Sequence, residues 1–163
     1  MMQRIVVGGV RKYSSSIMRR SEGGAAASKE LVLNFCTPHE PIYENKVVDY
    51  VALPGESGEY GVNAGLAPVI SQLKPGVVQV THVGGETEKF FIPGGFAITH
   101  DNNVTDVSVS EAYPLSDFDE AGVRSGYAAA QQSLASSDEV EKTKGMIEID
   151  TYQALGRALG ISL

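Results

Sequence analysis

The chain has 163 residues, of which 42% are hydrophobic and 20% charged, enough for one domain of ordinary size with a buried core and unlike a disordered chain. Its formal net charge is −7 at pH 7. A surface this acidic repels phosphate groups, so binding to nucleic acid or to an anionic membrane is not expected. No apolar run reaches about 18 residues, so no membrane-spanning helix is predicted.

The first 20 residues differ in charge from the rest of the chain. They contain no acidic residue and five basic ones, Arg4, Arg11, Lys12, Arg19 and Arg20. Without them the count of Lys and Arg falls from 13 to 8 against 20 Asp and Glu, a net charge of −12. An Arg-rich, acid-free start with serines at 14–16 is typical of a mitochondrial presequence, which we predict for residues 1–28. A secretory signal centred on residues 5–10 and a disordered basic tail are the alternatives.

Residues 29–113 are predicted to form an antiparallel β-sandwich or barrel. Short runs rich in β-branched and aromatic residues predict strands at 31–36, 42–53, 77–83, 88–92, 96–99 and 104–109. Turn signals separate these runs at 54–55, 75–76, 84–85, 93–95 and 101–103, and a Gly-rich loop is expected between Pro54 and Pro75. Many short strands with no helical pattern between them favour a sandwich or barrel over a parallel sheet.

Residues 114–163 are predicted to form an antiparallel helical hairpin. Ser116, with Asp119 three residues later, resembles a capping box at the start of a first helix. A break at 136–139 precedes a second apolar-periodic segment, which Gly160 is expected to end. The two helices, each of about 20 residues, carry few large apolar side chains, so we expect the hairpin to dock on the sandwich or on a partner. The fold class is therefore α+β, mainly β.

No residue pattern predicts an active site. The three histidines, His39, His82 and His100, show no metal-ligand spacing with one another or with Cys36. Cys36 is the only cysteine, which excludes an internal disulfide and is typical of a small core residue. The Gly-rich stretch lacks the Lys and Ser/Thr of a phosphate-binding loop. We therefore predict no catalytic residue, no metal and no cofactor, and favour a binding or coupling role.

Three segments resemble a known family. They are Leu53–Ile70, Leu73–Val80 and Phe90–Ala97. Their order and spacing are similar to those of the small central-stalk subunits of rotary ATP synthases, called epsilon in bacteria and plastids and delta in mitochondria. The resemblance extends from Leu31 to Ile161. It implies a β-sandwich followed by a helical hairpin, and a non-catalytic rotor element that couples proton flow to ATP synthesis.

The resemblance also implies partners and sites. The implied partners are the gamma stalk subunit, the membrane rotor ring, the small mitochondrial epsilon subunit and, indirectly, the catalytic alpha/beta hexamer, at the matrix face of the mitochondrial inner membrane. The implied rotor-ring interface is Ser57, Glu59 and Tyr60. The implied gamma-stalk interface is Leu66, Ala67 and Pro68, in which Leu66 replaces a family histidine and favours an apolar contact. The implied structural turn residues are Pro54, Gly55, Gly58, Gly61, Pro75, Gly76, Gly94 and Gly95.

Two other functions stay open at this point. A freestanding β-sandwich module that binds a small ligand or a peptide would have a pocket in the sandwich and would be monomeric. A small hydrolase on a β scaffold would need a nucleophile and a base, and no such pair is visible in the sequence. A stalk subunit would instead expose an apolar flank. Residues 149–155 lack the arginine arrangement of bacterial ATP-binding hairpins, so no nucleotide site is expected.

Overall fold

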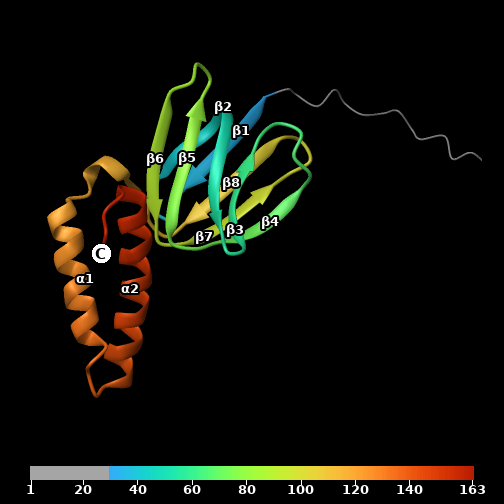
Figure 1. Cartoon of the computed structure of the whole chain (residues 1–163). Helices are drawn as coiled ribbons and strands as arrows, with labels where there is room; N and C mark the ends of the chain where they lie inside the picture. The colour runs from blue at the N-terminus through green and yellow to red at the C-terminus, as the bar shows by residue number, and fades with distance from the viewer. Residues whose placement is uncertain (1–29) are drawn as a thin grey trace, which may run out of the picture.

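The computed structural model describes residues 30–163, so the predicted presequence lies outside the described residues. A β-sandwich is followed by a two-helix hairpin that lies against one side of it (Figure 1). The strands are β1 (Leu31–Cys36), β2 (Pro41–Gly55), β3 (Gly58–Val62), β4 (Val69–Leu73), β5 (Gly76–His82), β6 (Thr87–Ile92), β7 (Gly95–Thr99), β8 (Val104–Val109) and β9 (Tyr113–Pro114). A short 3-10 turn η1 (Leu115–Asp117) leads to the helices α1 (Glu120–Ser133) and α2 (Glu139–Leu159).

The strands form one sheet that folds back on itself into two layers. Its order is β1-β8-β7-β4-β2-β5-β6-β9, with β3 paired to β2 and β1 also paired to β2. The long strand β2 crosses between the layers, because its first part pairs with β1 and its last part with β3, β4 and β5. This architecture confirms the predicted sandwich. The β1–β8 pair is parallel, a detail that strand periodicity does not predict.

Alternating apolar side chains fill the interior between the two layers. In β1, every second residue is fully buried, from Leu31 to Phe35, which is the period of a strand with one face on the core. The Phe35 ring meets the Phe90 ring edge-on with centroids 5.6 Å apart. The other fully buried side chains include Val48, Val51, Leu53, Val62, Val78, Val80, Ile92 and Val107. The space between the two layers is therefore filled by a packed hydrophobic core.

The segment between Pro54 and Pro75 differs from the loop expected there. It contains two strands, β3 and β4. Pro54 and Gly55 are the last residues of β2, and the turn itself is formed by residues 56–57. Frequent glycine and proline concealed these strands, because in isolation both residues indicate turns. The other predicted turn residues lie within or beside strands: Gly58 and Gly61 in β3, Pro75 and Gly76 around the start of β5, Gly94 and Gly95 around the start of β7.

The hairpin confirms the prediction of two helices and corrects the start of the first. The Asp119 side chain caps α1 by accepting from the Gly122 N–H at 2.9 Å, whereas Ser116 lies in η1, so the capping box predicted at Ser116 is wrong. Consequently α1 has 14 residues, fewer than the predicted length. Helix α2 has 21 residues and ends, as predicted, at Gly160, whose φ of 72° is left-handed.

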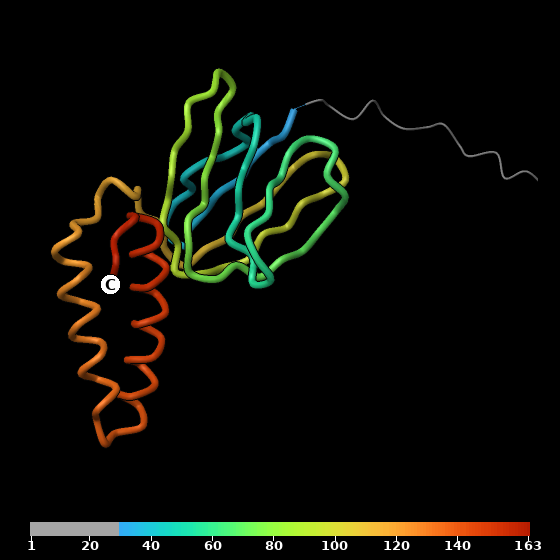
Figure 2. The backbone as a smooth tube through the Cα atoms, viewed as in Figure 1, coloured from blue at the N-terminus to red at the C-terminus, as the bar shows by residue number. Residues whose placement is uncertain are grey.

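One end of the hairpin docks on the outer face of β5 and β6, as the backbone trace shows (Figure 2). A second apolar cluster holds it there, in which Phe91 of β6 packs against Val123, Ala154 and Leu155. The other half of the hairpin extends beyond the sandwich (Figure 1) and exposes large apolar side chains, including Val140 at 75% and Ile147 at 63%. The expectation that the hairpin docks on the sandwich is confirmed for its near half.

Candidate functional site

Three turns meet at one end of the sandwich, which we call the turn end: residues 56–57, 74–75 and 93–94. Backbone hydrogen bonds join the first two turns, since Lys74 N donates to Pro54 O and Glu56 N donates to Gln72 O, both at 3.0 Å. The third turn lies beside them because Gly95 pairs with Leu73. Glycine allows this close approach, because a Cβ on Gly76 would lie 2.7 Å from the Pro54 Cβ. The Gly and Pro residues around these turns thus build a compact, rigid end.

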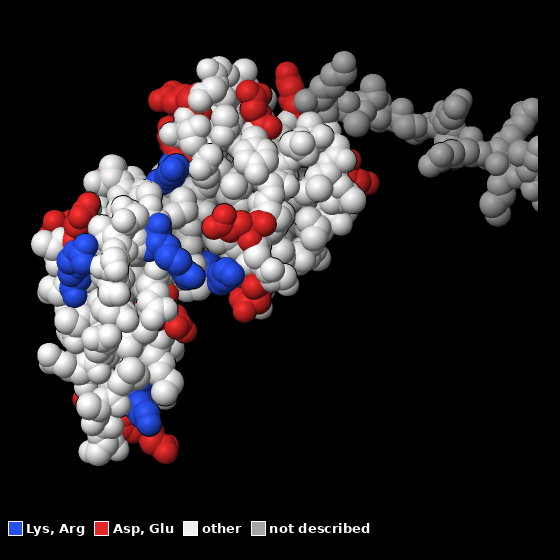
Figure 3. All heavy atoms as spheres, viewed as in Figure 1, with Lys and Arg blue, Asp and Glu red and all other residues white. Residues whose placement is uncertain are grey.

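Glu59 lies in a cleft between the turn end and α2, which we call the junction cleft. The cleft has a volume of about 220 Å³ and is lined by Glu59, Lys74 and Arg157 together with apolar residues of β5 and α2. A more open groove shares Lys74 and Arg157 with it and continues along α2 past Glu56 to Ile147. Figure 3 shows basic side chains gathered where the sandwich meets the hairpin, with acidic ones beside them. The side chains of Lys74 and Arg157 make no ion pair or hydrogen bond with any residue in the described range.

The three residues of the predicted rotor-ring interface point in different directions. Ser57 is exposed at the tip of the β2–β3 turn, and Glu59 is exposed on β3. Tyr60, the next residue, points the other way and packs against the core. Its hydroxyl group forms a hydrogen bond with the Ser71 hydroxyl group of β4. The structure therefore leaves Ser57 and Glu59 available for contact and gives Tyr60 a supporting position. Sequence reasoning missed Lys74 and Arg157, although Lys74 lies within one of the segments that carry the family resemblance.

The predicted gamma-stalk residues lie at the opposite end of β3 and β4. Leu66 is half-buried against the core, whereas Ala67 and Pro68 are exposed. Their loop is held to the β7–β8 turn, because the Gly65 N–H donates to the Asn103 side chain at 2.7 Å. The two predicted interfaces thus occupy different ends of the sandwich, joined by two short strands.

An exposed apolar surface runs from this loop across the outer side of β4 and β7. Ile70 of β4 is 75% exposed and stands opposite Ile98 of β7, which is 37% exposed, while the neighbouring Phe96 is 57% exposed. We call Ile70, Phe96 and Ile98 the β4–β7 face. Three large apolar side chains together on an open sheet surface are typical of an interaction site.

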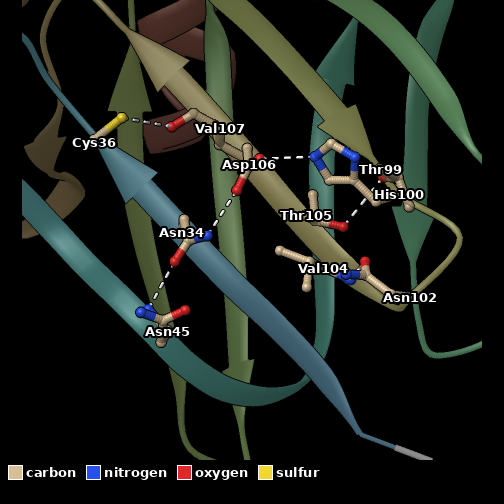
Figure 4. A network of polar contacts seen from close by, with 10 residues as sticks. All are labelled: Asn34, Cys36, Asn45, Thr99, His100, Asn102, Val104, Thr105, Asp106 and Val107. Atoms are coloured by element: carbon tan, nitrogen blue, oxygen red, sulfur yellow. Dashed lines mark hydrogen bonds and ion pairs between the residues drawn. The ribbon is translucent and has the colours of Figure 1, made fainter. Parts of the chain in front are cut away.

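Polar residues beside this face form a structural network on β1, β7 and β8 (Figure 4). Asp106 accepts from the Asn34 amide at 2.7 Å and contacts His100 Nε2 at 2.8 Å. Burial raises the pKa of Asp106, but hydrogen bonds from Asn34 and His100 outweigh it and hold that pKa below its ordinary value. The Asn34 side chain also accepts from the Asn45 N–H at 2.7 Å. The network ties the strands β1, β7 and β8 together.

A second polar cluster lies between β2, β5 and β6. The Tyr43 hydroxyl donates to Glu88, and burial together with this bond raises the pKa of Tyr43 well above its ordinary value. His82 Nε2 lies 3.3 Å from the other Glu88 oxygen, outside hydrogen-bond geometry, so both of its buried ring nitrogens lack a hydrogen bond within the described residues. Tyr43 also meets the His82 ring edge-on at 5.6 Å. The cluster joins three strands.

Within residues 30–163, no group of three His, Cys, Asp or Glu side chains could hold a metal ion. Over the same range, none of the helices is long and apolar enough to cross a membrane. The features that stand out are surfaces for contact: the turn end with the junction cleft, and the β4–β7 face.

Comparison with known proteins gives a consistent result. The family model described as ATP synthase, Delta/Epsilon chain, beta-sandwich domain, matches residues 30–114. The chain is 36% identical over 152 residues to the mitochondrial ATP synthase subunit delta of Yarrowia lipolytica, covering 93% of this chain and 94% of that protein. It is 35% identical over 157 residues to the corresponding subunit of Agaricus bisporus, covering 96% of each chain.

A solved structure shares the whole architecture. A chain in the cryo-EM structure of the Euglena gracilis mitochondrial ATP synthase, an assembly of OSCP, F1 and the c-ring, superposes with a TM-score of 0.78 at 27% identity. The match covers 94% of this chain and 91% of that chain. It therefore includes the sandwich and the hairpin together.

Proposed function

Because this chain belongs to the family of ATP synthase delta/epsilon chains, we propose that it is a rotor subunit of the mitochondrial ATP synthase that links the gamma stalk to the membrane rotor ring. It is a non-catalytic subunit of that complex. Its role is mechanical: it transmits rotation between proton flow through the ring and ATP synthesis in the alpha/beta hexamer. We place it at the matrix face of the inner membrane, after import directed by the predicted presequence.

The β4–β7 face is the observation that supports this proposal best. In the isolated chain it leaves Ile70, Phe96 and Ile98 in water, an arrangement whose free energy improves when another protein covers it. Ala67 and Pro68 border the face at the start of β4. We assign the gamma-stalk contact to this face together with Leu66, Ala67 and Pro68.

The turn end is the surface that we assign to the rotor ring. Two of its three turns are cross-linked by backbone hydrogen bonds, and such rigidity suits an element that passes torque without bending. Ser57 and Glu59 are the exposed contact groups, and Tyr60 holds β3 against β4. The exposed far half of the hairpin, with Val140, is the surface that we assign to the small mitochondrial epsilon subunit.

The alternative of a freestanding binding module gains no support from the sandwich interior. Leu33, Phe35, Val51 and Val78, which lie between the layers, are all 0% exposed, so side chains occupy the space that a ligand would need. We therefore propose no second function.

The proposal is tested by purifying the protein from mitochondria in mild detergent through a tag placed after Leu163. Mass spectrometry then identifies the chains that accompany it. We expect the catalytic hexamer, the gamma stalk and the rotor ring in constant proportion to the tagged chain. Recovery of the tagged chain as a lone protein would refute the proposal.

A further inference from the structure

A charged pair lies beside the β4–β7 face. His100 directly follows β7, and its Nε2 atom lies 2.8 Å from the Oδ2 atom of Asp106 on β8 (Figure 4). In the β7–β8 register Asp106 stands opposite Ile98, a residue of that face. Its neighbours in the strand, Thr105 and Val107, are fully buried, so Asp106 points outward on the same side of the sheet as Ile98. The pair therefore continues the exposed side of the sheet from the β4–β7 face.

The pair also adjoins the loop that completes the proposed stalk contact. The last pair in the register of β4 with β7 is Val69 with Thr99. Pro68 and His100 are the next residues along the two chain segments. The turn that begins at His100 holds the loop in place, because the Asn103 side chain accepts a backbone N–H of the loop at 2.7 Å. A partner that covers both the β4–β7 face and this loop therefore covers the charged pair as well.

The charge of the pair depends on one proton. The pKa of Asp106 lies below its ordinary value, so its carboxylate is ionised at neutral pH. An ionised carboxylate only accepts hydrogen bonds, so the Nε2 atom of His100 carries a proton in this contact. Without a second proton on its ring, His100 is neutral and the pair has one net negative charge. With that proton, which a histidine ring gains or loses between about pH 5 and 8, the charges of the pair balance.

The elements packed around the pair bring few other charges, and most of these are acidic. They are Asp101 in the same turn, Glu30 before β1, and Glu44 and Lys46 on β2, beyond β1. The loop and β4 on the other side, residues 63–73, contain no charged residue. Lys46 is the single base among them, and β1 separates its strand from that of Asp106. His100 is thus the group that is placed to neutralise Asp106.

We propose that the chain takes up a proton at His100 when it binds the gamma stalk, so that this contact tightens as the pH falls. In the free chain the two side chains are 43% and 44% exposed, and water solvates the pair in either charge state. A covering partner removes that water, which costs more when the pair carries a net charge than when its charges balance. The inference rests on the proposed function, because the partner is the gamma stalk.

The neutralising charge comes from His100 and not from the partner. Both carboxylate oxygens of Asp106 already have a bond, since the Asn34 amide donates to Oδ1 at 2.7 Å and His100 occupies Oδ2. Because the bound chain then holds more protons than the free chain, binding is strongest where free His100 is already protonated, and it weakens as the pH rises. One proton limits this change to about tenfold in affinity per pH unit.

Isothermal titration calorimetry of the full chain with a subcomplex of the alpha, beta and gamma subunits tests the proposal. The titration is repeated from about pH 6 to about pH 8, each time in two buffers whose ionisation enthalpies differ, because the difference in heat counts the protons taken up. We expect proton uptake on binding, up to about one proton per chain, and an affinity that falls as the pH rises.

Two variants identify the group that takes up the proton. His100→Gln keeps an N–H donor for Asp106 but cannot gain the proton, so it should abolish the uptake and flatten the pH dependence while binding persists. His39→Gln is the matched control, because His39 is exposed in the β1–β2 turn, outside the surfaces assigned to partners. This control should keep both the uptake and the pH dependence of the native chain.

The possible results separate this inference from the proposed function. Binding of the native chain without proton uptake, or with proton release, overturns the inference and leaves the proposed function standing. Uptake that persists in His100→Gln does the same. The proton count in the native chain decides the question even where a variant fails to fold. Absence of binding at every pH refutes the stalk contact and this inference together.

Discussion

Substitution of Ile70 by aspartate should weaken assembly of the chain into the complex while leaving the stability of its fold almost unchanged. Ile70 is 75% exposed, so burial in the isolated chain contributes only about a quarter of the ~2–3 kcal/mol of a fully buried isoleucine. The free energy of unfolding should therefore change by less than about 1 kcal/mol. If the gamma stalk covers the β4–β7 face, the substitution removes about 2 kcal/mol of apolar burial and adds about 1–3 kcal/mol for a desolvated carboxylate. Such a loss, about 3–5 kcal/mol in all, corresponds to roughly a 10²- to 4 × 10³-fold weaker contact.

The assay is competition between two forms of the chain in one cell. A tagged Ile70→Asp chain and the untagged native chain are expressed together, and their ratio in the purified ATP synthase is measured. Val83→Asp is the matched control, because Val83 is also well exposed, at 65%, but lies in the β5–β6 turn, outside the surfaces assigned to partners. We expect the Ile70 variant to be nearly absent from the complex and the Val83 variant to retain a share close to that of the native chain. Equal incorporation of Ile70→Asp and the native chain would refute the assignment of this face.

The remaining predictions concern the stability of the fold. Gly76→Val should lower the free energy of unfolding by about 1–3 kcal/mol in urea titration, because a Cβ would lie 2.7 Å from that of Pro54; unchanged stability would show that the turn end can yield. The pKa of Asp106 is lowered in the fold, so the ionised carboxylate stabilises the folded state. Its contribution to the free energy of unfolding is present above its ordinary pKa of 3.8 and is lost as the pH falls through the lowered value. Asp106→Asn should therefore remove that part of the fall in melting temperature that is seen at acidic pH. Leu155→Ala should cost about 2–5 kcal/mol and speed amide exchange in α1 and α2 more than in β5, whereas equal acceleration in both would contradict separate docking of the hairpin.

The sequence predicted correctly those elements that are determined by residues close together in the chain. The strand Leu31–Cys36, the hairpin turn at Gly84 and Gly85 and the helix stop at Gly160 depend on side-chain period or backbone conformation within a few residues. The strands β3 and β4 were missed for a physical reason. The glycines of β3 allow close approach to a neighbouring strand, as at Gly61, whose added Cβ would collide with the Tyr50 ring, and such contacts are invisible in one sequence.

The candidate surfaces required the tertiary structure. Glu59 and Leu66 are seven positions apart in the sequence, and only the course of β3 places their neighbourhoods at opposite ends of the sandwich. Arg157 joins Glu59 at the junction cleft because the hairpin folds back along β5. The parallel pairing of β1 with β8 likewise depends on contacts about 70 residues apart, which periodicity does not encode.

The central claim is that this chain couples proton movement to the catalytic hexamer, and proton pumping by depleted membranes tests it most directly. Inner-membrane vesicles are prepared from cells that lack the chain and from the same cells complemented with it, and ATP-driven acidification is compared with ATP hydrolysis. We predict that depletion abolishes acidification and ATP synthesis while the hexamer still hydrolyses ATP, and that the complemented cells regain both. Normal acidification and ATP synthesis in membranes without the chain would contradict the account.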